Sequence, residues 1–216
     1  MRHVLFLAAF ATITIASCDM LELPQAESKN DGKIFLTNPK NMEGTYTTTG
    51  PHGFFYRGQV LKVTSQGEYQ IVFINSYKVD DNICWLDGTE PVFIGKTTFI
   101  ADEQSQTYAV SVPAEEISCY LHFNTEKSVK LSDILLKGVS NKIFTDGDFV
   151  DSNPTMKLMG SSYVIAAPME ISIGIQLVDE HGATQEIKVL KTTLNAKPRH
   201  QYSIRVGEDE ISVSSN

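Results

Sequence analysis

The side chains that most often perform catalysis or bind metals are few in this sequence, and their spacing favours neither task. No two histidines stand at the i, i+2 or i, i+4 spacing that directs two imidazoles toward one metal ion. The histidines are His3, His52, His122, His181 and His200. The sequence contains neither a Gly-x-Ser-x-Gly nucleophile elbow nor a glycine-rich phosphate loop. We therefore predict a protein that is not an enzyme and that carries no cofactor and no metal.

Three aspartates lie close together in Thr-Asp-Gly-Asp-Phe-Val-Asp-Ser-Asn-Pro, at Asp146, Asp148 and Asp151. Oxygen ligands at alternate positions can surround calcium, but the EF-hand order with its distal glutamate is absent. We predict a solvated turn here, with a calcium site as the alternative. Asp80-Asp81-Asn82 is interpreted in the same way.

The single tryptophan, Trp85, precedes the turn residues Asp87-Gly88. A lone tryptophan is usually part of a core or of an interface between domains, and we predict that role. The alternative is a stacking platform for a sugar, to which Tyr56 and Tyr77 would also contribute.

The cysteines are Cys18, Cys84 and Cys119. In an oxidising compartment Cys84 and Cys119 can form a disulfide that closes a loop of about 35 residues. They can equally be small buried side chains in strands. Both interpretations stay open, whereas a zinc site is disfavoured because no second ligand follows at C-x-x-C or C-x-x-H spacing.

The chain begins with an export signal. Arg2 precedes an apolar run, Val4 to Ile15, that is too short to span a bilayer, and Ile15-Ala16-Ser17 leads directly into Cys18. This order resembles a bacterial lipobox, which implies cleavage before Cys18 and attachment of lipid to its thiol. An ordinary secretory signal is the alternative. Either signal would export the chain.

The composition is that of a folded, acidic protein. The chain has 216 residues, of which 42% are hydrophobic and 20% charged, enough for one or two domains. The net charge is −8, and it becomes −9 without residues 1–17, which hold Arg2 and no acidic residue. Such a surface repels phosphate backbones, so nucleic acid is an unfavourable partner.

Hydrophobic residues recur with a period of two along most of the chain. The clearest example is Ile171, Ile173, Ile175 and Leu177, which alternate with polar residues and glycine. Further strands are predicted at 59–64, 68–77, 92–100, 107–112, 117–123, 129–139, 184–194 and 202–206, with one early strand around Ile34-Phe35-Leu36. Many short strands with hardly a helical stretch predict an all-β protein built from antiparallel β-sandwiches.

These strands are more than one small sandwich needs, so we predict two packed units divided near Pro113. The predicted organisation is a signal peptide at 1–17, a tether or leader at 18–41, and sandwiches at 42–113 and 114–216. A single larger sandwich is the alternative.

Three stretches carry a family resemblance: Gly67–Asn75 (GEYQIVFIN), Tyr120–Val139 (YLHFNTEKSVKLSDILLKGV) and Leu194–Val206 (LNAKPRHQYSIRV). Together with the lipobox they are similar to the fimbrillin-like surface lipoproteins of Bacteroidales. The match covers most of the mature chain, although Lys197-Pro198 stands where the family usually has a glycine turn. The resemblance implies two transthyretin-like β-sandwich domains after a lipoprotein signal peptide.

The resemblance also implies a function. It indicates a lipid-anchored protein of the outer membrane or cell surface that serves as a fimbrial subunit or as an accessory or anchor protein. Its partners would be other fimbrial subunits, joined by β-strand donation after a protease trims the leader behind a basic residue. Arg57, the only arginine between Cys18 and Arg199, is the candidate cleavage site, and an ordinary surface position is the favoured alternative. A surface module that binds a glycan or protein ligand is the alternative function.

Overall fold

The computed structural model describes residues 32–76, 79–80, 82–148 and 154–215, and these residues are almost entirely strands and turns. One short 3-10 turn, η1 (Pro51–Gly53), accompanies the strands. The strands are β1 (Lys33–Thr37), β2 (Thr45–Thr49), β3 (Phe55–Arg57), β4 (Val60–Lys62), β5 (Gly67–Ile74), β6 (Val79–Asp80), β7 (Ile83–Trp85), β8 (Phe93–Ala101), β9 (Tyr108–Ser111), β10 (Glu115–Glu116), β11 (Ser118–Thr125), β12 (Val129–Lys137), β13 (Lys142–Phe144), β14 (Thr155–Leu158), β15 (Ser162–Ile165), β16 (Pro168–Val178), β17 (Thr184–Asn195), β18 (Gln201–Val206) and β19 (Ile211–Ser215).

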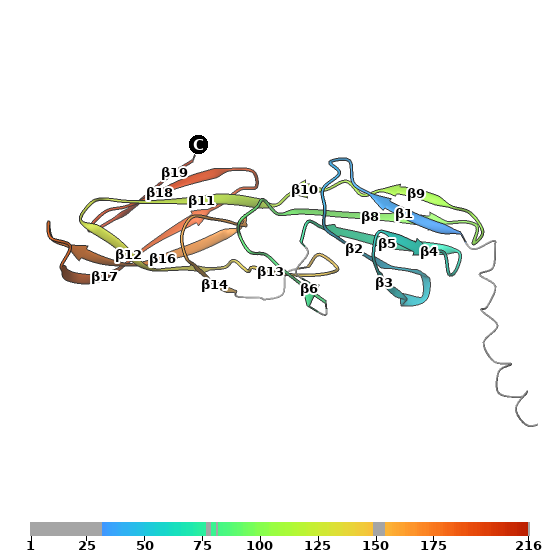
Figure 1. Ribbon diagram of the computed structural model, residues 1–216, viewed down its shortest axis with the longest axis horizontal. Coiled ribbons are helices and arrows are strands. Elements are labelled where there is room, and N and C mark those ends of the chain that lie inside the picture. The colour runs from blue at the N-terminus through green and yellow to red at the C-terminus, as the bar shows by residue number, and fades with distance from the viewer. Residues whose placement is uncertain (1–31, 77–78, 81, 149–153, 216) are drawn as a thin grey trace, which may run out of the picture.

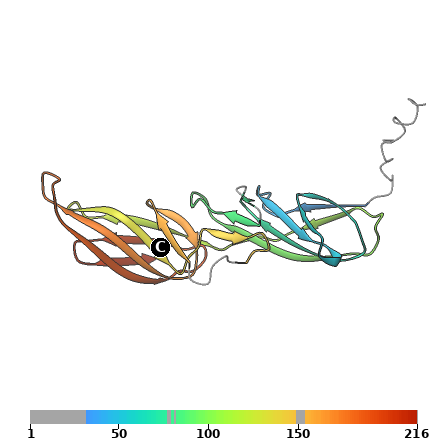
Figure 2. The ribbon, with the colours of Figure 1, turned by 90° about the horizontal axis from the view of Figure 1, so that it is seen from below.

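The molecule is a rod with two lobes, which Figures 1 and 2 show from two sides. The first lobe contains a three-stranded sheet in the order β4-β1-β9 and a five-stranded sheet in the order β10-β8-β5-β2-β3. Their inner faces enclose a core to which Ile34, Leu36, Tyr69, Ile71 and Phe73 contribute fully buried side chains. Alternation of buried and exposed residues along β1 and β5 supplies this face.

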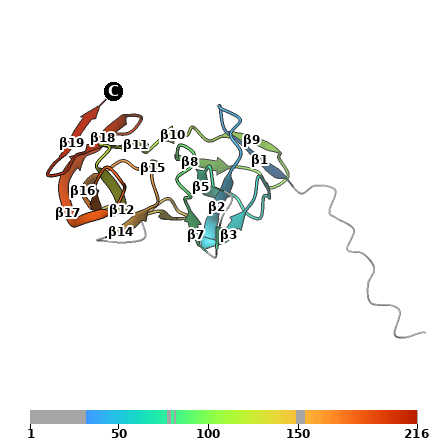
Figure 3. The same ribbon diagram turned by 60° about the vertical axis from the view of Figure 1, so that its left-hand side comes forward.

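The second lobe is a sandwich of two four-stranded sheets, ordered β15-β11-β18-β19 and β14-β12-β16-β17. Figure 3 shows these two sheets on opposite sides of the lobe. Its core is larger than that of the first lobe. Ile171, Ile173 and Ile175 are completely buried in it, as their alternation in the sequence predicts.

A small fifth sheet, β13-β7-β6, lies between the lobes. β13 follows β12 of the second lobe but pairs with β7, which comes from the earlier half of the chain. Ile143, in the middle of β13, is completely buried. The junction between the lobes is therefore itself hydrogen-bonded sheet.

The predicted all-β class and its antiparallel sheets are confirmed, with parallel pairing only of β1 with β9 and of β11 with β18 among the described strands. The stretch assigned to the tether includes β1, whose Ile34 and Leu36 are buried. The second core takes in Ile74, Cys84 and Val92 from before Pro113. The limits 42–113 and 114–216 stay a prediction, and the signal peptide lies outside the described residues.

Candidate functional site

The most distinctive feature of the first lobe is the position of its first strand. β1 lies between β4, with which it pairs antiparallel, and β9, with which it pairs parallel. Ile34 and Leu36 point into the core, with 0% and 1% of their surface exposed. β1 therefore fills a slot whose two walls and floor come from later parts of the chain.

Backbone hydrogen bonds hold both ends of β1 in this slot. At its start, the Gly32 amide donates to the Gln104 carbonyl (2.8 Å) and the Gly32 carbonyl accepts from the Val63 amide (2.9 Å). At its end, the Thr37 carbonyl accepts from the Val112 amide (2.7 Å). A Cβ atom on Gly32 would lie 2.1 Å from the Gln106 carbonyl oxygen, so only glycine permits this close approach.

The outer face of the same sheet is apolar. Phe35 of β1 is 43% exposed and pairs with Val60 of β4, which is 53% exposed, and with Ala109 of β9. These three residues form a row across all three strands. The row is accessible to solvent and leaves the outer side of the slot uncovered by the rest of the described chain.

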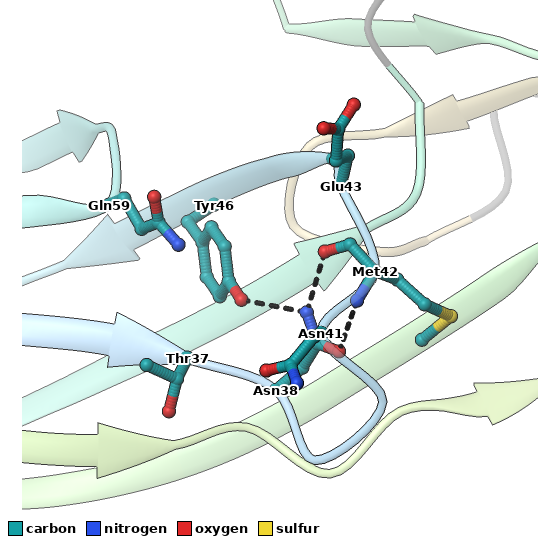
Figure 4. Close-up of a pocket in the computed structure, with 8 residues that line it drawn as sticks. Thr37, Asn38, Asn41, Met42, Glu43, Tyr46 and Gln59 are labelled. Atoms are coloured by element: carbon teal, nitrogen blue, oxygen red, sulfur yellow. Dashed lines mark hydrogen bonds between the residues drawn. The ribbon is translucent and has the colours of Figure 1, made fainter.

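A hollow of about 320 Å³ lies where β1 ends and the chain turns toward β2 (Figure 4). Its buried Asn38 donates from Nδ2 to the Met42 carbonyl (2.8 Å) and to the Tyr46 hydroxyl (2.9 Å), while its Oδ1 accepts from the Met42 amide (2.9 Å). These bonds satisfy the asparagine side chain and fix the turn. Asn38 therefore fixes the turn that connects β1 to β2.

Arg57 is exposed at the end of β3, the edge strand of the five-stranded sheet. Its Cα partner on β2 is Thr47, and the next amide, that of Gly58, donates to the Tyr46 carbonyl (3.0 Å). The peptide bond between Arg57 and Gly58 therefore lies at the surface of the first lobe, at the edge of its five-stranded sheet.

Cys84 and Cys119 are buried free thiols that belong to the same hydrophobic cluster. Burial raises the pKa of Cys84 to about 11 and that of Cys119 to about 12. A disulfide between them stays the alternative hypothesis. Cys18 lies outside the described residues.

The remaining candidates for chemistry are separate from one another. His122 is exposed on β11, where its Nδ1 lies 3.2 Å from Ser161 Oγ. Asp148 forms an ion pair with Lys96 (3.0 Å) and donates from its amide to Asp146, whereas Asp151 lies outside the described residues. Within the described ranges, no three histidine, cysteine, aspartate or glutamate side chains gather closely enough to hold a metal.

Trp85 is half-buried on β7, which pairs with β13 in the small sheet between the lobes. The Lys142 ammonium lies 4.4 Å from the centre of its ring. Tyr77, the other candidate for sugar stacking besides Tyr56, lies outside the described residues. The pairing of β13 with β7 that builds this junction was not foreseen, because the short stretch Lys142–Phe144 has no clear alternation.

No described helix has the length and apolar character needed to cross a membrane. No protein-family model matches the sequence, and no curated protein matches it either.

Solved structures do resemble the fold. The fimbrial anchor protein Mfa2 from Porphyromonas gingivalis matches with a TM-score of 0.50 at 8% identity, over 86% of this chain and 96% of that one. A candidate cell adhesion protein from Bacteroides uniformis matches with a TM-score of 0.49 at 10% identity, over 88% and 97%. A fimbrial assembly protein from Parabacteroides distasonis matches with a TM-score of 0.47 at 11% identity, over 86% and 98%. The likeness to Mfa2 extends over most of both chains and concerns the fold.

Proposed function

We propose that this chain is a non-enzymatic surface lipoprotein, a fimbrial subunit or an accessory or anchor protein, that assembles with other surface subunits by β-strand donation. The observation that carries the proposal is β1, a five-residue strand held between β4 and β9 with two side chains in the core. A strand in this position can be replaced by one from a neighbouring subunit that has the same alternation of side chains.

The physics of such an exchange follows from the slot. Without β1, the facing edges of β4 and β9 would carry unpaired amides and carbonyls, and the core would lose Ile34 and Leu36. An incoming strand would restore the hydrogen bonds and place alternate apolar side chains in the same two sites. An empty slot would therefore be unstable, and a partner strand that filled it would bind tightly because it removes that instability.

Attachment to the membrane is the second part of the proposal. Lipid on Cys18 would hold the protein at the outer membrane, and the acidic surface argues against attachment through a basic patch. The fold likeness to a fimbrial anchor protein supports an anchor or accessory role. The proposed partners are other fimbrial or surface subunits.

Cleavage at Arg57 stays a separate hypothesis, and an ordinary surface position is the favoured alternative. A cut between Arg57 and Gly58 would leave β1, β2 and β3 on the amino-terminal fragment. That fragment includes Tyr46, which is 4% exposed in the core, so its loss would remove far more than a leader. Strand exchange at the slot requires no such cut if β1 detaches while still joined to the chain.

The slot can be tested with a pair of engineered cysteines, Phe35→Cys with Val60→Cys. The two residues are Cα partners on neighbouring strands and both are partly exposed, so a disulfide between them reports that β1 occupies its own slot.

Intact cells that produce this variant would then be treated with a chemical crosslinker. We expect some copies of the chain to be recovered crosslinked to other surface subunits, which we call the joined fraction. The engineered disulfide should be absent from the joined fraction and present in free chains.

The matched control is Arg205→Cys with Ser212→Cys, a partner pair on β18 and β19 that should crosslink in both fractions. Joined chains that keep the engineered disulfide between β1 and β4 would exclude exchange at β1 but leave assembly intact. Recovery of the natural chain, which lacks the engineered cysteines, only as single copies would overturn the proposed function.

A further inference from the structure

Two adjoining pockets lie at the junction between the lobes, with volumes of about 690 Å³ and about 260 Å³. They share the segment Trp85–Thr89, and the larger one is completed by Tyr120, Asn141 and the β14–β15 turn, 156–162. We call the two together the junction pocket. Its larger part falls within the size range of small-ligand sites, about 300–1,000 Å³.

Partly exposed aromatic rings line this pocket. Tyr120 faces outward because its neighbours on β11, Cys119 and Leu121, are completely buried. Its ring centre lies 4.8 Å from that of Tyr163 on the neighbouring strand, and Trp85 lines the same pocket. Flat, half-exposed rings of this kind can receive an apolar ring face of a ligand.

The walls of the pocket are fixed in place. The Gly88 carbonyl accepts from the Tyr163 amide (2.8 Å) and from Ser162 Oγ (3.1 Å), which fastens the loop after β7 to β15. The Leu86 amide donates to the Asn141 carbonyl (2.8 Å), which fastens the same loop to the start of β13. Gly88 has φ +77°, and a Cβ there would lie 2.1 Å from Ser162 Oγ. A ligand would therefore not have to order this loop on binding.

The polar groups in the pocket suit a neutral ligand. Lys157 forms an ion pair with Asp133, and Asp87 accepts from both the amide (2.9 Å) and the hydroxyl (2.7 Å) of Thr89. Lys157 is thus ion-paired within the protein, and the bonds of Asp87 to Thr89 lie within the loop after β7. The remaining lining groups, such as Asn141 and Ser161, are uncharged donors and acceptors.

We propose that the junction pocket binds a neutral oligosaccharide, with a pyranose ring stacked against Tyr120 and its hydroxyls bonded to the uncharged polar side chains. A sugar combines a flat apolar face with a rim of hydroxyls, which is the combination that this pocket presents. An extended peptide fits less well, because the β15 backbone at Tyr163 is already bonded to Gly88. This activity is additional to the proposed assembly through β1.

The test uses the single tryptophan as its reporter. In the folded chain labelled with nitrogen-15, the one indole N–H resonance belongs to Trp85 and needs no assignment. Cellohexaose, mannohexaose and N-acetylated chitohexaose, all neutral, would be titrated separately to millimolar concentrations. We expect at least one of them to shift the indole resonance in a saturable way. No shift with any of the three would overturn the proposal, as would a shift with an extended valine-rich peptide alone.

Three variants locate the binding. Tyr120→Ala should weaken binding about tenfold, whereas Tyr120→Phe, which keeps the ring, should bind nearly as tightly as the natural chain. Tyr56→Ala, in the other lobe, is the matched control and should leave binding unchanged. Equal affinity of Tyr120→Ala and Tyr56→Ala would also overturn the proposal. None of these outcomes depends on whether β1 exchanges.

Discussion

The hydroxyl of Thr47 donates a hydrogen bond of 2.5 Å to the backbone carbonyl of Thr145, 98 residues further along the chain. Both residues are buried, and the Thr145 amide in turn donates to the Asn82 carbonyl (2.8 Å). A segment that follows β12 of the second lobe is thereby joined to β2 of the first. Hydrogen bonds between distant segments therefore join the two lobes in addition to their covalent connection.

Removal of this hydroxyl should destabilise the folded chain. Thr47→Val would leave the buried Thr145 carbonyl without its partner, at a cost of about 1–3 kcal/mol in the free energy of unfolding. Thr47→Ser keeps the donor and should cost about 1 kcal/mol or less. Urea denaturation of the three proteins measures both values. Equal losses for valine and serine would show that the hydrogen bond contributes nothing.

The small sheet between the lobes should also matter for stability. Ile143→Ala removes a completely buried side chain from β13 and should lower the free energy of unfolding by about 2–5 kcal/mol. Ile100→Ala, at a position that is 68% exposed, should change it by no more than about 0.5 kcal/mol. A thermal or urea unfolding curve compares them. Similar small effects at both positions would contradict the burial of β13.

The buried thiols predict a loss of stability at alkaline pH. Burial raises the pKa of Cys84 from an ordinary value of 9.0 to about 11, and that of Cys119 to about 12. The unfolded chain would therefore lose these protons first, and the free energy of unfolding should fall as the pH rises from about 9 toward 11. Cys84→Ala with Cys119→Ala should flatten this part of the pH profile.

The state of the same two cysteines can be measured directly. We expect iodoacetamide at pH 8 to leave both thiols of the folded chain unmodified and to label both once the chain is unfolded. Mass spectrometry counts the labels. Labelling of the unfolded chain that requires prior reduction would instead establish a disulfide between Cys84 and Cys119.

The lipid anchor predicts where the chain is found. Replacement of residues 1–18 by an ordinary secretory signal that is cut before Asp19 should move the protein from the membrane fraction to the soluble fraction, because the acyl chains supply the membrane affinity. The mass of the native amino-terminal peptide should include the acyl groups on Cys18. A chain secreted without Cys18 that sediments with membranes like the natural chain would contradict the anchor.

The sequence predicted the sheets well where alternation was strong. Ile171, Ile173 and Ile175 are buried as expected. A shift of the strand by one residue would turn all three side chains toward solvent, so the alternation fixes which face is buried. It also indicated the strand at Ile34–Leu36, since an apolar patch within a polar stretch needs a partner surface. Which strands would flank it could not be derived, because the pairing depends on residues as distant as Tyr108–Ser111.

The junction shows the same limit more sharply. Lys142–Phe144 and Ile83–Trp85 are each three residues long, too short for a periodic pattern, and their pairing joins segments that are far apart in the sequence. The junction pocket arises only from this pairing, so Trp85 and Tyr120 could be recognised as aromatic residues but not as neighbours. Pairing between short, distant segments depends on the tertiary fold, so it cannot be predicted from local patterns in one sequence.

The parallel pairing of β1 with β9 has a consequence for the order of folding. The partner residues, Tyr108–Ser111, come from the far end of the first lobe, so this pair forms only when most of that lobe's chain has been brought together. We therefore expect β1 to take its place late in folding, after local hairpins such as β2 with β3 have formed.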